Sequence, residues 1–226
     1  MTVDKTIKNA VACDWLNSFQ ELTMYSQNKF YKIVGCLVLG IELIKLPRTD
    51  EYRPHFTLYP LWEKNVKECL NIPIVLEEFY NSKKNQFSIP YEKHIQYFEE
   101  VSQIIEKQFP FILKDNIQTD VITSMIDNYS QKKRFSIAPN SYFQANFLEA
   151  KLKIALYTSV SKAQEILNYI KNRDWDIKHF QACGVEVTQW VKDLQNETDN
   201  QELFLKQIEL NKQDKNLVKI KMSKLI

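Results

Sequence analysis

The sequence predicts an α+β protein, in which a small antiparallel sheet packs on helices and a mainly helical C-terminal half follows. Two stretches predict the sheet. Residues 30–46 form a nearly continuous β-branched and aromatic run, and residues 52–62 alternate between apolar and polar side chains. Glycine is scarce, with three among 226 residues, which weighs against a barrel or sandwich of many tight turns. Hydrophobic residues make up 44% of the chain, enough to build a core.

Residues 4–25 are predicted to form the first helix, because apolar side chains recur at helical spacing and no glycine or proline interrupts them. Residues 30–46 are then interpreted as one long strand, and Pro47 to Asp50 as the turn that follows it. A four-residue loop at 47–50 brings the apolar faces of the two arms together. This register pairs Glu42 with His55.

The return strand over residues 52–62 is predicted to bury its even positions and to expose its odd ones. The core side would carry Tyr52, Phe56, Leu58 and Trp62, and the polar side would carry Arg53, His55, Thr57 and Tyr59. Two prolines in this arm remove hydrogen-bond donors from the ladder. An edge or a bulge is therefore expected on one side of the strand.

Residues 63–226 are predicted to be mainly helical. Residues 63–85 are compatible with two short helices and residues 86–90 with a third strand. Apolar residues at helical spacing then predict helices over 91–109, 115–130, 141–172 (one long helix or two), 175–195 and 200–213, with a β-like tail at 217–222. The predicted domains are an α+β domain over residues 1–137 and a helical domain or subdomain over 138–226.

Composition narrows the possible partners and the compartment. The 30 basic and 28 acidic residues leave a net charge of +2, and acidic residues interrupt the basic tail, so nucleic acid is disfavoured as a partner. The polar N-terminus and the short apolar run at 33–41 predict no signal peptide and no membrane partner. Four cysteines without a C-x-x-C pair predict a cytoplasmic protein with free thiols, no metal site and no cofactor.

The predicted polar face of the return strand is the candidate site. If Glu42 opposes His55, the carboxylate raises the basicity of the imidazole, as general acid–base chemistry requires. Arg53 beside them could hold a phosphate or a carboxylate. The alternative is a cross-strand polar pair on a solvated sheet face, which contributes at most about 1 kcal/mol to stability. Outside this face, His94 is expected to be a partly buried helix residue that is satisfied by a neighbour.

A protein-interaction module is the function that these features favour. No common hydrolase, zinc-protease or nucleotide-binding motif occurs, and tyrosine, tryptophan and arginine are enriched at binding hot spots. The lysine-, asparagine- and isoleucine-rich composition suggests a bacterial gene, and hence a toxin-immunity protein or an accessory subunit of a defence complex. Another protein would then bind Arg53, His55, Thr57 and Tyr59. The alternatives are a hydrolase- or nuclease-like enzyme that uses His55 and Glu42 as catalytic residues and, more weakly, nucleic-acid binding.

Overall fold

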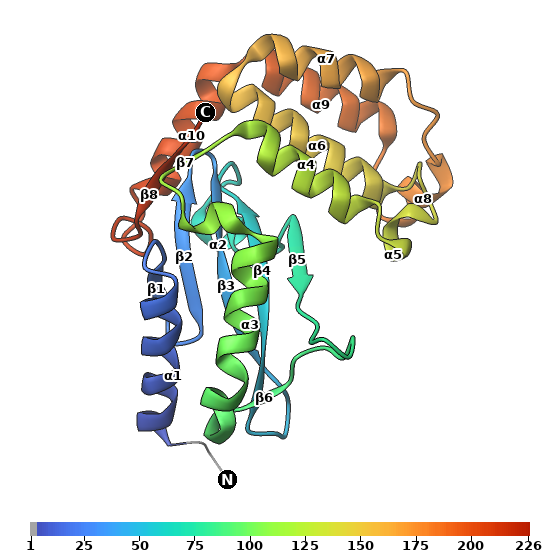
Figure 1. The fold of residues 1–226 in the computed structure, drawn as a ribbon. Coiled ribbons are helices and arrows are strands. Elements are labelled where there is room, and N and C mark those ends of the chain that lie inside the picture. The colour runs from blue at the N-terminus through green and yellow to red at the C-terminus, as the bar shows by residue number, and fades with distance from the viewer. Residues whose placement is uncertain (1–3) are drawn as a thin grey trace. The chain divides into compact units, whose positions relative to one another are not determined.

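The computed structural model describes residues 4–226 and has the predicted α+β fold (Figure 1). The helices are α1 (Lys5–Ser18), α2 (Val66–Cys69), α3 (His94–Gln108), α4 (Thr119–Ser130), α5 (Lys133–Ser136), α6 (Tyr142–Thr158), α7 (Val160–Lys171), α8 (Ile177–Ala182), α9 (Val187–Asp199) and α10 (Gln201–Lys212), with 3-10 turns η1 (Tyr91–Lys93) and η2 (Pro110–Leu113). The strands are β1 (Thr23–Ser26), β2 (Lys29–Val34), β3 (Leu37–Lys45), β4 (Glu51–Pro60), β5 (Val75–Glu78), β6 (Ile89–Pro90), β7 (Asn116–Ile117) and β8 (Met222–Leu225).

The chain forms two compact units, and each is built from separate segments. Unit 1 comprises the chain up to Tyr59 together with Val75–Asn116 and Gln213–Lys224. Unit 2 comprises Pro60–Ile74, Ile117–Lys212 and Leu225–Ile226. The boundary expected between residues 137 and 138 stays a prediction, and residues 1–3 of the predicted first domain lie outside the described residues.

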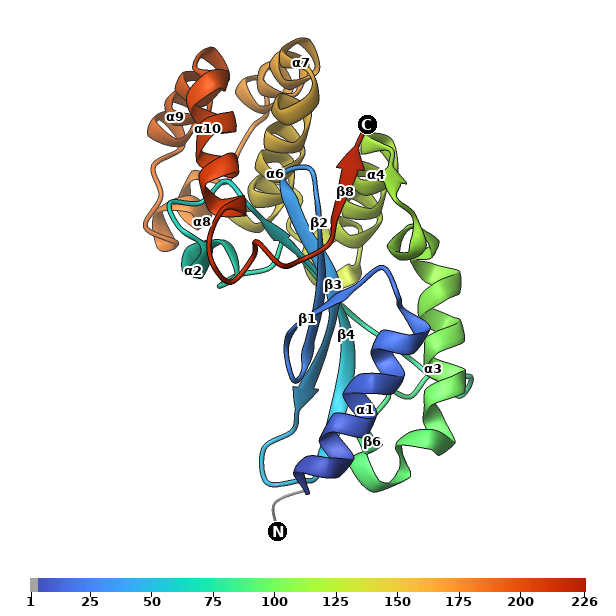
Figure 2. The same cartoon turned by 90° about the vertical axis from the view of Figure 1, so that its left-hand side faces the viewer.

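The sheet has the strand order β5-β4-β3-β2-β8-β7, with β1 added to β2 and β6 added to β4. The pairs β1–β2, β2–β3, β4–β5 and β4–β6 are antiparallel. Strand β8 instead runs parallel to β2, with Ile33 paired to Met222. Figures 1 and 2 show that α1 and α3 cover the same face of the sheet. The aromatic rings of Trp15 and Phe98 meet between these two helices, with centroids 5.1 Å apart.

The prediction of one long strand over residues 30–46 was wrong. The segment folds into a hairpin of β2 and β3, in which Val34 pairs with Leu37 and Gly35 has φ 58°. A two-residue turn of this kind needs a positive φ, which glycine adopts without strain. The unbroken apolar pattern concealed the turn because both arms are buried and both are rich in β-branched residues.

The first predicted helix was too long at its C-terminal end. Helix α1 ends at Ser18, and Thr23–Ser26 forms β1, whose residue Thr23 pairs with Tyr31 of β2. Helical spacing of apolar residues persists through this segment, so the pattern alone does not mark the end. Pairing with β2 decides the conformation here, since tertiary contacts override weak local propensity.

The core side of β4 is confirmed for Tyr52, Phe56 and Leu58, but the exposure expected for the opposite side was wrong, because His55, Thr57 and Tyr59 are buried as well. Leu46 donates its backbone N–H to the carbonyl of Glu51 at 3.0 Å, which closes the predicted four-residue loop at 47–50. Tyr52, Phe56 and Leu58 are fully buried. The ring of Phe56 stacks on that of Phe109 with centroids 4.1 Å apart, so this face packs against the segment that follows α3.

Three further predictions of secondary structure need correction. Of the two short helices considered for residues 63–85, the first corresponds to α2, but the second does not form, because Val75–Glu78 forms β5 and pairs with β4. The helix expected over 175–195 is interrupted between α8 and α9, where Gly184 has φ 75°. The tail strand lies at Met222–Leu225 rather than at 217–222.

Unit 2 is organised around α6, which packs against α4 and α7 (Figure 1). Two helices form where one or two were expected, because the Ser159 side chain accepts a hydrogen bond from Lys162 N–H and caps α7. Ser141 caps α6 in the same way. One hydrophobic cluster in the core of this unit consists of Ala145, Leu152, Leu167, Ile170, Trp175, Phe180, Trp190 and Leu194.

Lys32 is a fully buried lysine in unit 1. Its ammonium donates to the backbone carbonyls of Phe111 at 3.3 Å and Lys114 at 2.8 Å. Burial lowers the pKa of Lys32 to about 8, although the charges of Glu21 and Asp115 oppose the shift. The folded chain therefore releases this proton before the unfolded chain does.

We expect the free energy of unfolding to rise with pH above about pH 8, since the unfolded chain, with an ordinary lysine pKa near 10.4, then binds more protons. The contribution of Lys32 reaches roughly 2 kcal/mol by about pH 9.5. Urea unfolding at about pH 7 and pH 9.5 measures it. Lys32→Met should remove the rise, while Lys45→Met, at an exposed position of β3, should keep it. Equal pH slopes in the two variants would contradict the assignment.

Candidate functional site

Glu42 lies on the predicted polar face and is 7% exposed. Its carboxylate accepts a hydrogen bond from the hydroxyl of Tyr59 at 2.7 Å and a second from the hydroxyl of Tyr31. The ammonium of Lys29, which pairs with Glu42 across the β2–β3 hairpin, lies 3.2 Å from the same oxygen. The polar face at this point is therefore a buried network of one carboxylate, two phenols and one lysine.

His55 is also buried, and its hydrogen-bond partner is not Glu42. Its Nδ1 lies 3.1 Å from the carbonyl oxygen of Arg53, and Glu78 of β5 is its partner in the strand register. Burial lowers the pKa of His55, while the backbone contact and the charges of Glu78 and Glu42 act in the opposite direction. A neutral imidazole is the form that this environment favours.

The remaining two members of the predicted cluster are separate from the Glu42 network. Arg53 donates from Nη1 to the side-chain oxygen of Gln86 at 2.6 Å. Thr57 is fully buried, and its hydroxyl has no hydrogen-bond partner among the described residues. The structure thus joins Glu42 to Tyr59 and directs Arg53 and His55 to other partners. None of these predicted site residues lines either of two large cavities of unit 2.

His94 contacts a neighbour through each ring nitrogen, but it is buried rather than partly buried, and its Nε2 meets Asp14 only at ion-pair distance without a hydrogen bond among the described residues. It is 3% exposed. Its Nδ1 lies 2.6 Å from the hydroxyl of Tyr52, and its Nε2 lies 3.2 Å from a carboxylate oxygen of Asp14. These contacts tie α3 to α1 and β4 within unit 1, and they account for this histidine structurally.

The strongest candidate site is a groove in unit 2 with a volume of about 530 Å³, called here the aromatic–acidic groove. It lies between residues 60–74 and the helices α4 to α6. Six aromatic rings and two carboxylates line it, and no lysine or arginine is among the described lining residues. Basic groups do lie over some of these rings: Lys153 is 6.0 Å from the Trp62 ring, and Arg134 is 5.3 and 4.8 Å from the rings of Tyr129 and Phe135. The lining residues are Pro60, Trp62, Glu63, Ile72, Pro73, Ile74, Tyr129, Phe135, Tyr142, Phe143, Asn146, Phe147, Glu149 and Ala150.

The segment that carries Trp62 and Glu63 is held in place from α10. The amide of Asn211, which is 4% exposed, donates to the backbone carbonyls of Leu61 at 2.9 Å and Glu63 at 2.7 Å. The ring of Trp62 lies 6.2 Å from that of Phe204. One wall of the groove is therefore ordered by buried hydrogen bonds and aromatic packing.

Charge in the floor of the groove is unbalanced. Lys153 is buried and forms ion pairs with Glu149 at 3.0 Å and Glu197 at 3.1 Å. Glu149 also accepts a hydrogen bond from the indole N–H of Trp190 at 2.7 Å. The single positive charge of Lys153 is thus shared by the two negative charges of Glu149 and Glu197. Glu63 adds a third negative charge beside them.

Glu63 is half-buried, and no described residue donates a hydrogen bond or an ion pair to its carboxylate. Burial raises the pKa of Glu63, and the charges of Glu149, Glu197 and Glu68 raise it further against the opposing effect of Lys153. A cation in the groove would relieve this unfavourable environment. The arrangement is therefore suited to binding a positive charge between a carboxylate and aromatic rings.

The sequence contained a partial signal for this groove. Trp62 ends the alternating strand and was predicted to point into the sheet core, whereas the structure places it in unit 2 as a half-buried side chain. Its neighbours Tyr142 to Ala150 lie about eighty residues later in the chain. Such a separation cannot be bridged by local periodicity.

No protein-family model, no curated protein and no solved structure matches this chain. Among residues 4–226, no helix has the length and the apolar character needed to cross a bilayer.

Proposed function

We propose that this protein is a protein-interaction module whose aromatic–acidic groove binds a lysine or arginine side chain of a partner protein. The observation that carries the proposal is the half-buried, unpaired carboxylate of Glu63 in a groove lined by six rings and no basic residue. An arginine or lysine side chain satisfies both features, since its charge pairs with the carboxylate and also interacts favourably with ring faces.

A peptide segment suits the groove better than an isolated amine. Ile72 and Phe143 line it and are 73% and 55% exposed, respectively. Exposed apolar side chains beside a charged pocket are typical of protein-binding surfaces. The partner segment is therefore expected to carry apolar residues on either side of its basic residue, so that they cover Ile72 and Phe143.

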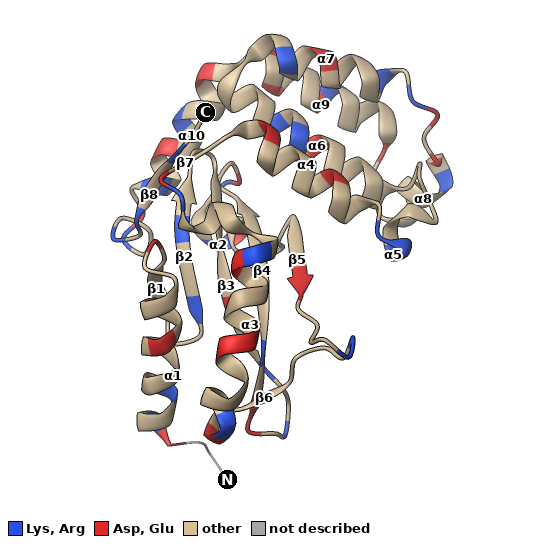
Figure 3. Ribbon diagram, viewed as in Figure 1, with Lys and Arg blue, Asp and Glu red and all other residues tan. Residues whose placement is uncertain are grey.

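Nucleic acid is a weaker candidate for the partner. Figure 3 shows acidic positions among the basic ones along α10, where Glu209 lies between Lys206 and Lys212. This alternation opposes the continuous positive surface that phosphate binding needs. The toxin-immunity or defence role is one setting in which a basic protein partner would occur, and it belongs to the same proposal.

The probe that tests the groove is the peptide acetyl-Leu-Arg-Leu-amide, with acetyl-Leu-citrulline-Leu-amide as its neutral isostere. The readout is the indole N–H resonance of Trp62, which Trp62→Phe identifies among the four tryptophans. The arginine peptide should shift this resonance, and the citrulline peptide should bind at least about tenfold more weakly. Equal binding of the two peptides would show that charge is not recognised.

Glu63→Gln should lower the affinity for the arginine peptide by about tenfold, because the Glu63 carboxylate is the only one in the groove without a partner among the described residues. Binding of the citrulline peptide should not change. The control is Glu202→Gln, at an exposed position of α10. In the parent protein, acidification should also weaken binding of the arginine peptide as Glu63 becomes protonated. Because the pKa of Glu63 is raised, this loss of affinity should begin at a higher pH than it would for an ordinary glutamate. Unchanged affinity in Glu63→Gln would refute the proposed role of this carboxylate.

A further inference from the structure

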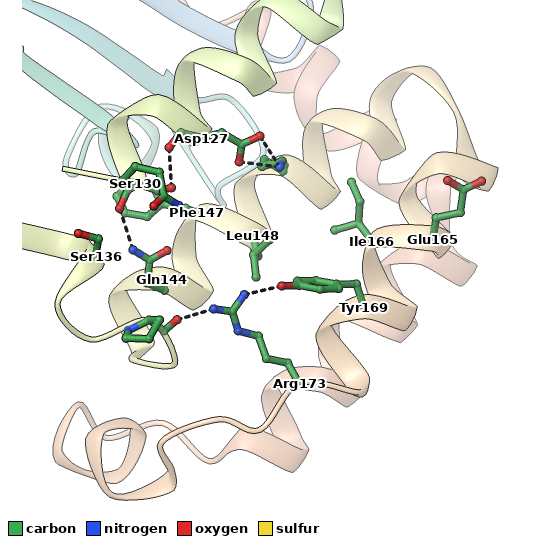
Figure 4. Close-up of a pocket in the computed structure, with 13 residues that line it drawn as sticks. Asp127, Ser130, Ser136, Gln144, Phe147, Leu148, Glu165, Ile166, Tyr169 and Arg173 are labelled. Carbon is green, nitrogen blue, oxygen red and sulfur yellow. Dashed lines mark hydrogen bonds and ion pairs between the residues drawn. The ribbon is translucent and has the colours of Figure 1, made fainter. Parts of the chain in front are cut away.

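A second cavity of unit 2, with a volume of about 520 Å³, opens on another side of α6, between α4 and α7 (Figure 4). We call it the α6–α7 cavity. Its floor is apolar and includes Phe147, Leu148 and Ile166, and its rim is polar. The polar rim and the remaining wall consist of Asp127, Ser130, Gln131, Ser136, Pro139, Gln144, Lys151, Glu165, Tyr169 and Arg173. An apolar floor with a few polar groups is the usual composition of a small-molecule site.

Arg173 is fixed in position by three neutral acceptors. Its Nε donates to the side-chain oxygen of Asn140 at 3.0 Å, Nη1 to the hydroxyl of Tyr169 at 2.9 Å, and Nη2 to the carbonyl of Pro139 at 2.6 Å. The guanidinium carbon also lies 5.0 Å from the ring centre of Trp175. These contacts orient the group without neutralising its charge.

Two N–H groups of Arg173 are not used by any described residue. A guanidinium has five N–H donors, and each terminal nitrogen has spent one of its two. In Figure 4 the Tyr169 hydroxyl lies on one side of the Arg173 guanidinium. The carbonyl of Pro139 and the side chain of the adjacent Asn140 accept from Nη2 and Nε, on the other edge of the group. One N–H on each terminal nitrogen is thus left for a ligand, and Gln144 and Leu148 are the side chains that Figure 4 shows near this end of Arg173. This fork matches the two oxygens of a carboxylate.

The other charges of the cavity leave Arg173 uncompensated. Lys151 and Asp127 satisfy each other through two contacts of 2.7 and 2.8 Å. Glu165 is exposed, and among the described residues it forms no ion pair with Arg173. The positive charge of Arg173 is thus the one that a ligand would meet next to the apolar floor.

We propose that the α6–α7 cavity binds a small organic carboxylate with an apolar body. The carboxylate takes the two unused N–H groups of Arg173, and the apolar body covers Leu148 and Ile166. Gln144 contributes a fixed polar wall, because its amide N–H is already bound to the carbonyl of Ser130 at 2.9 Å. The inference rests on this cavity alone and is independent of the aromatic–acidic groove.

Benzoate is the probe for this site, with benzamide and inorganic phosphate as comparison ligands. Titration is followed by calorimetry and by the indole N–H resonance of Trp175. Benzoate should bind and shift this resonance, and benzamide and phosphate should each bind at least about tenfold more weakly. Benzamide binding equal to that of benzoate would overturn the role of Arg173, and equal phosphate binding would overturn the role of the apolar floor. Absence of benzoate binding to the folded protein would overturn the site.

Arg173→Lys separates the fork from simple charge. Lysine keeps the charge but cannot present two parallel donors, so benzoate binding should weaken by about tenfold. The control is Lys171→Arg, a conservative exchange at the exposed last residue of α7, two positions before Arg173. If Arg173→Lys disturbs the Pro139 loop, Leu148→Phe provides the second test, because it fills the cavity and leaves Arg173 intact. Full benzoate affinity in folded Leu148→Phe would overturn the proposal.

Discussion

Replacing Gly40 by alanine is expected to destabilise the protein by at least about 4 kcal/mol, which approaches the whole stability of many domains. A Cβ atom at this position would lie 1.9 Å from the carbonyl oxygen of Phe30 and 2.9 Å from the Cα of Tyr31. Both contacts are with the backbone of the adjacent strand β2, so no side chain can rotate away. The sheet itself would have to separate at the pairing of Tyr31 with Gly40.

Gly184→Ala is the matched control for this prediction. Gly184 has φ 75°, and no atom lies within 4 Å of the position that a Cβ would take. The substitution Gly184→Ala should therefore destabilise the protein only by the strain of holding alanine in the left-handed backbone region, about 1 kcal/mol. Chemical denaturation and circular dichroism of the two variants measure the difference. A Gly40→Ala protein that unfolds within about 1 kcal/mol of the parent would show that β2 and β3 are not packed as described.

Glu42→Leu is expected to lower the free energy of unfolding by about 3 kcal/mol, because two buried phenols lose their acceptor. Tyr31 is fully buried and Tyr59 is 4% exposed, so water cannot readily replace the carboxylate. The side chain of Lys29 is 36% exposed and can regain solvent. Lys29→Met should therefore cost less than about 1 kcal/mol.

A double-mutant cycle distinguishes the hydrogen-bond network from simple loss of packing. When Tyr31 and Tyr59 are both phenylalanine, Glu42→Leu should cost about 1 kcal/mol or less, because the unsatisfied donors are gone. Glu42→Gln should be milder than Glu42→Leu in the parent protein, since its amide oxygen still accepts. Equal costs of Glu42→Leu in both backgrounds would exclude coupling between the carboxylate and the phenols.

The same network predicts the titration of the two tyrosines. Burial raises the pKa of Tyr31 and of Tyr59, and the negative charge of Glu42 raises both further. Both hydroxyls therefore remain donors at pH values where exposed tyrosines ionise. Because these pKa values are higher in the folded chain, this stabilisation is present at neutral pH and is lost as pH rises above about 10.

A single missed turn accounts for the difference between the predicted and the observed partners of Glu42. When residues 30–46 are treated as one strand, Tyr31 lies at its far end and cannot meet Glu42. The turn at Gly35 folds β2 back on β3, which places Lys29 opposite Glu42 and Tyr31 opposite Gly40 on the same face. The chemistry of the polar side of β4 thus changes from a proposed acid–base pair to a buried network.

The sequence by itself determined the α+β class, the loop at 47–50 and the core positions of Tyr52, Phe56 and Leu58, because these depend on side-chain alternation and on turn residues that act over a few positions. Only the tertiary structure decided that Glu63 faces the aromatic rings of α4 to α6 and that Arg173 presents a free pair of donors beside Leu148. The physical reason is that a side chain's partners depend on packing between segments distant in the chain, and local periodicity carries no information on that packing.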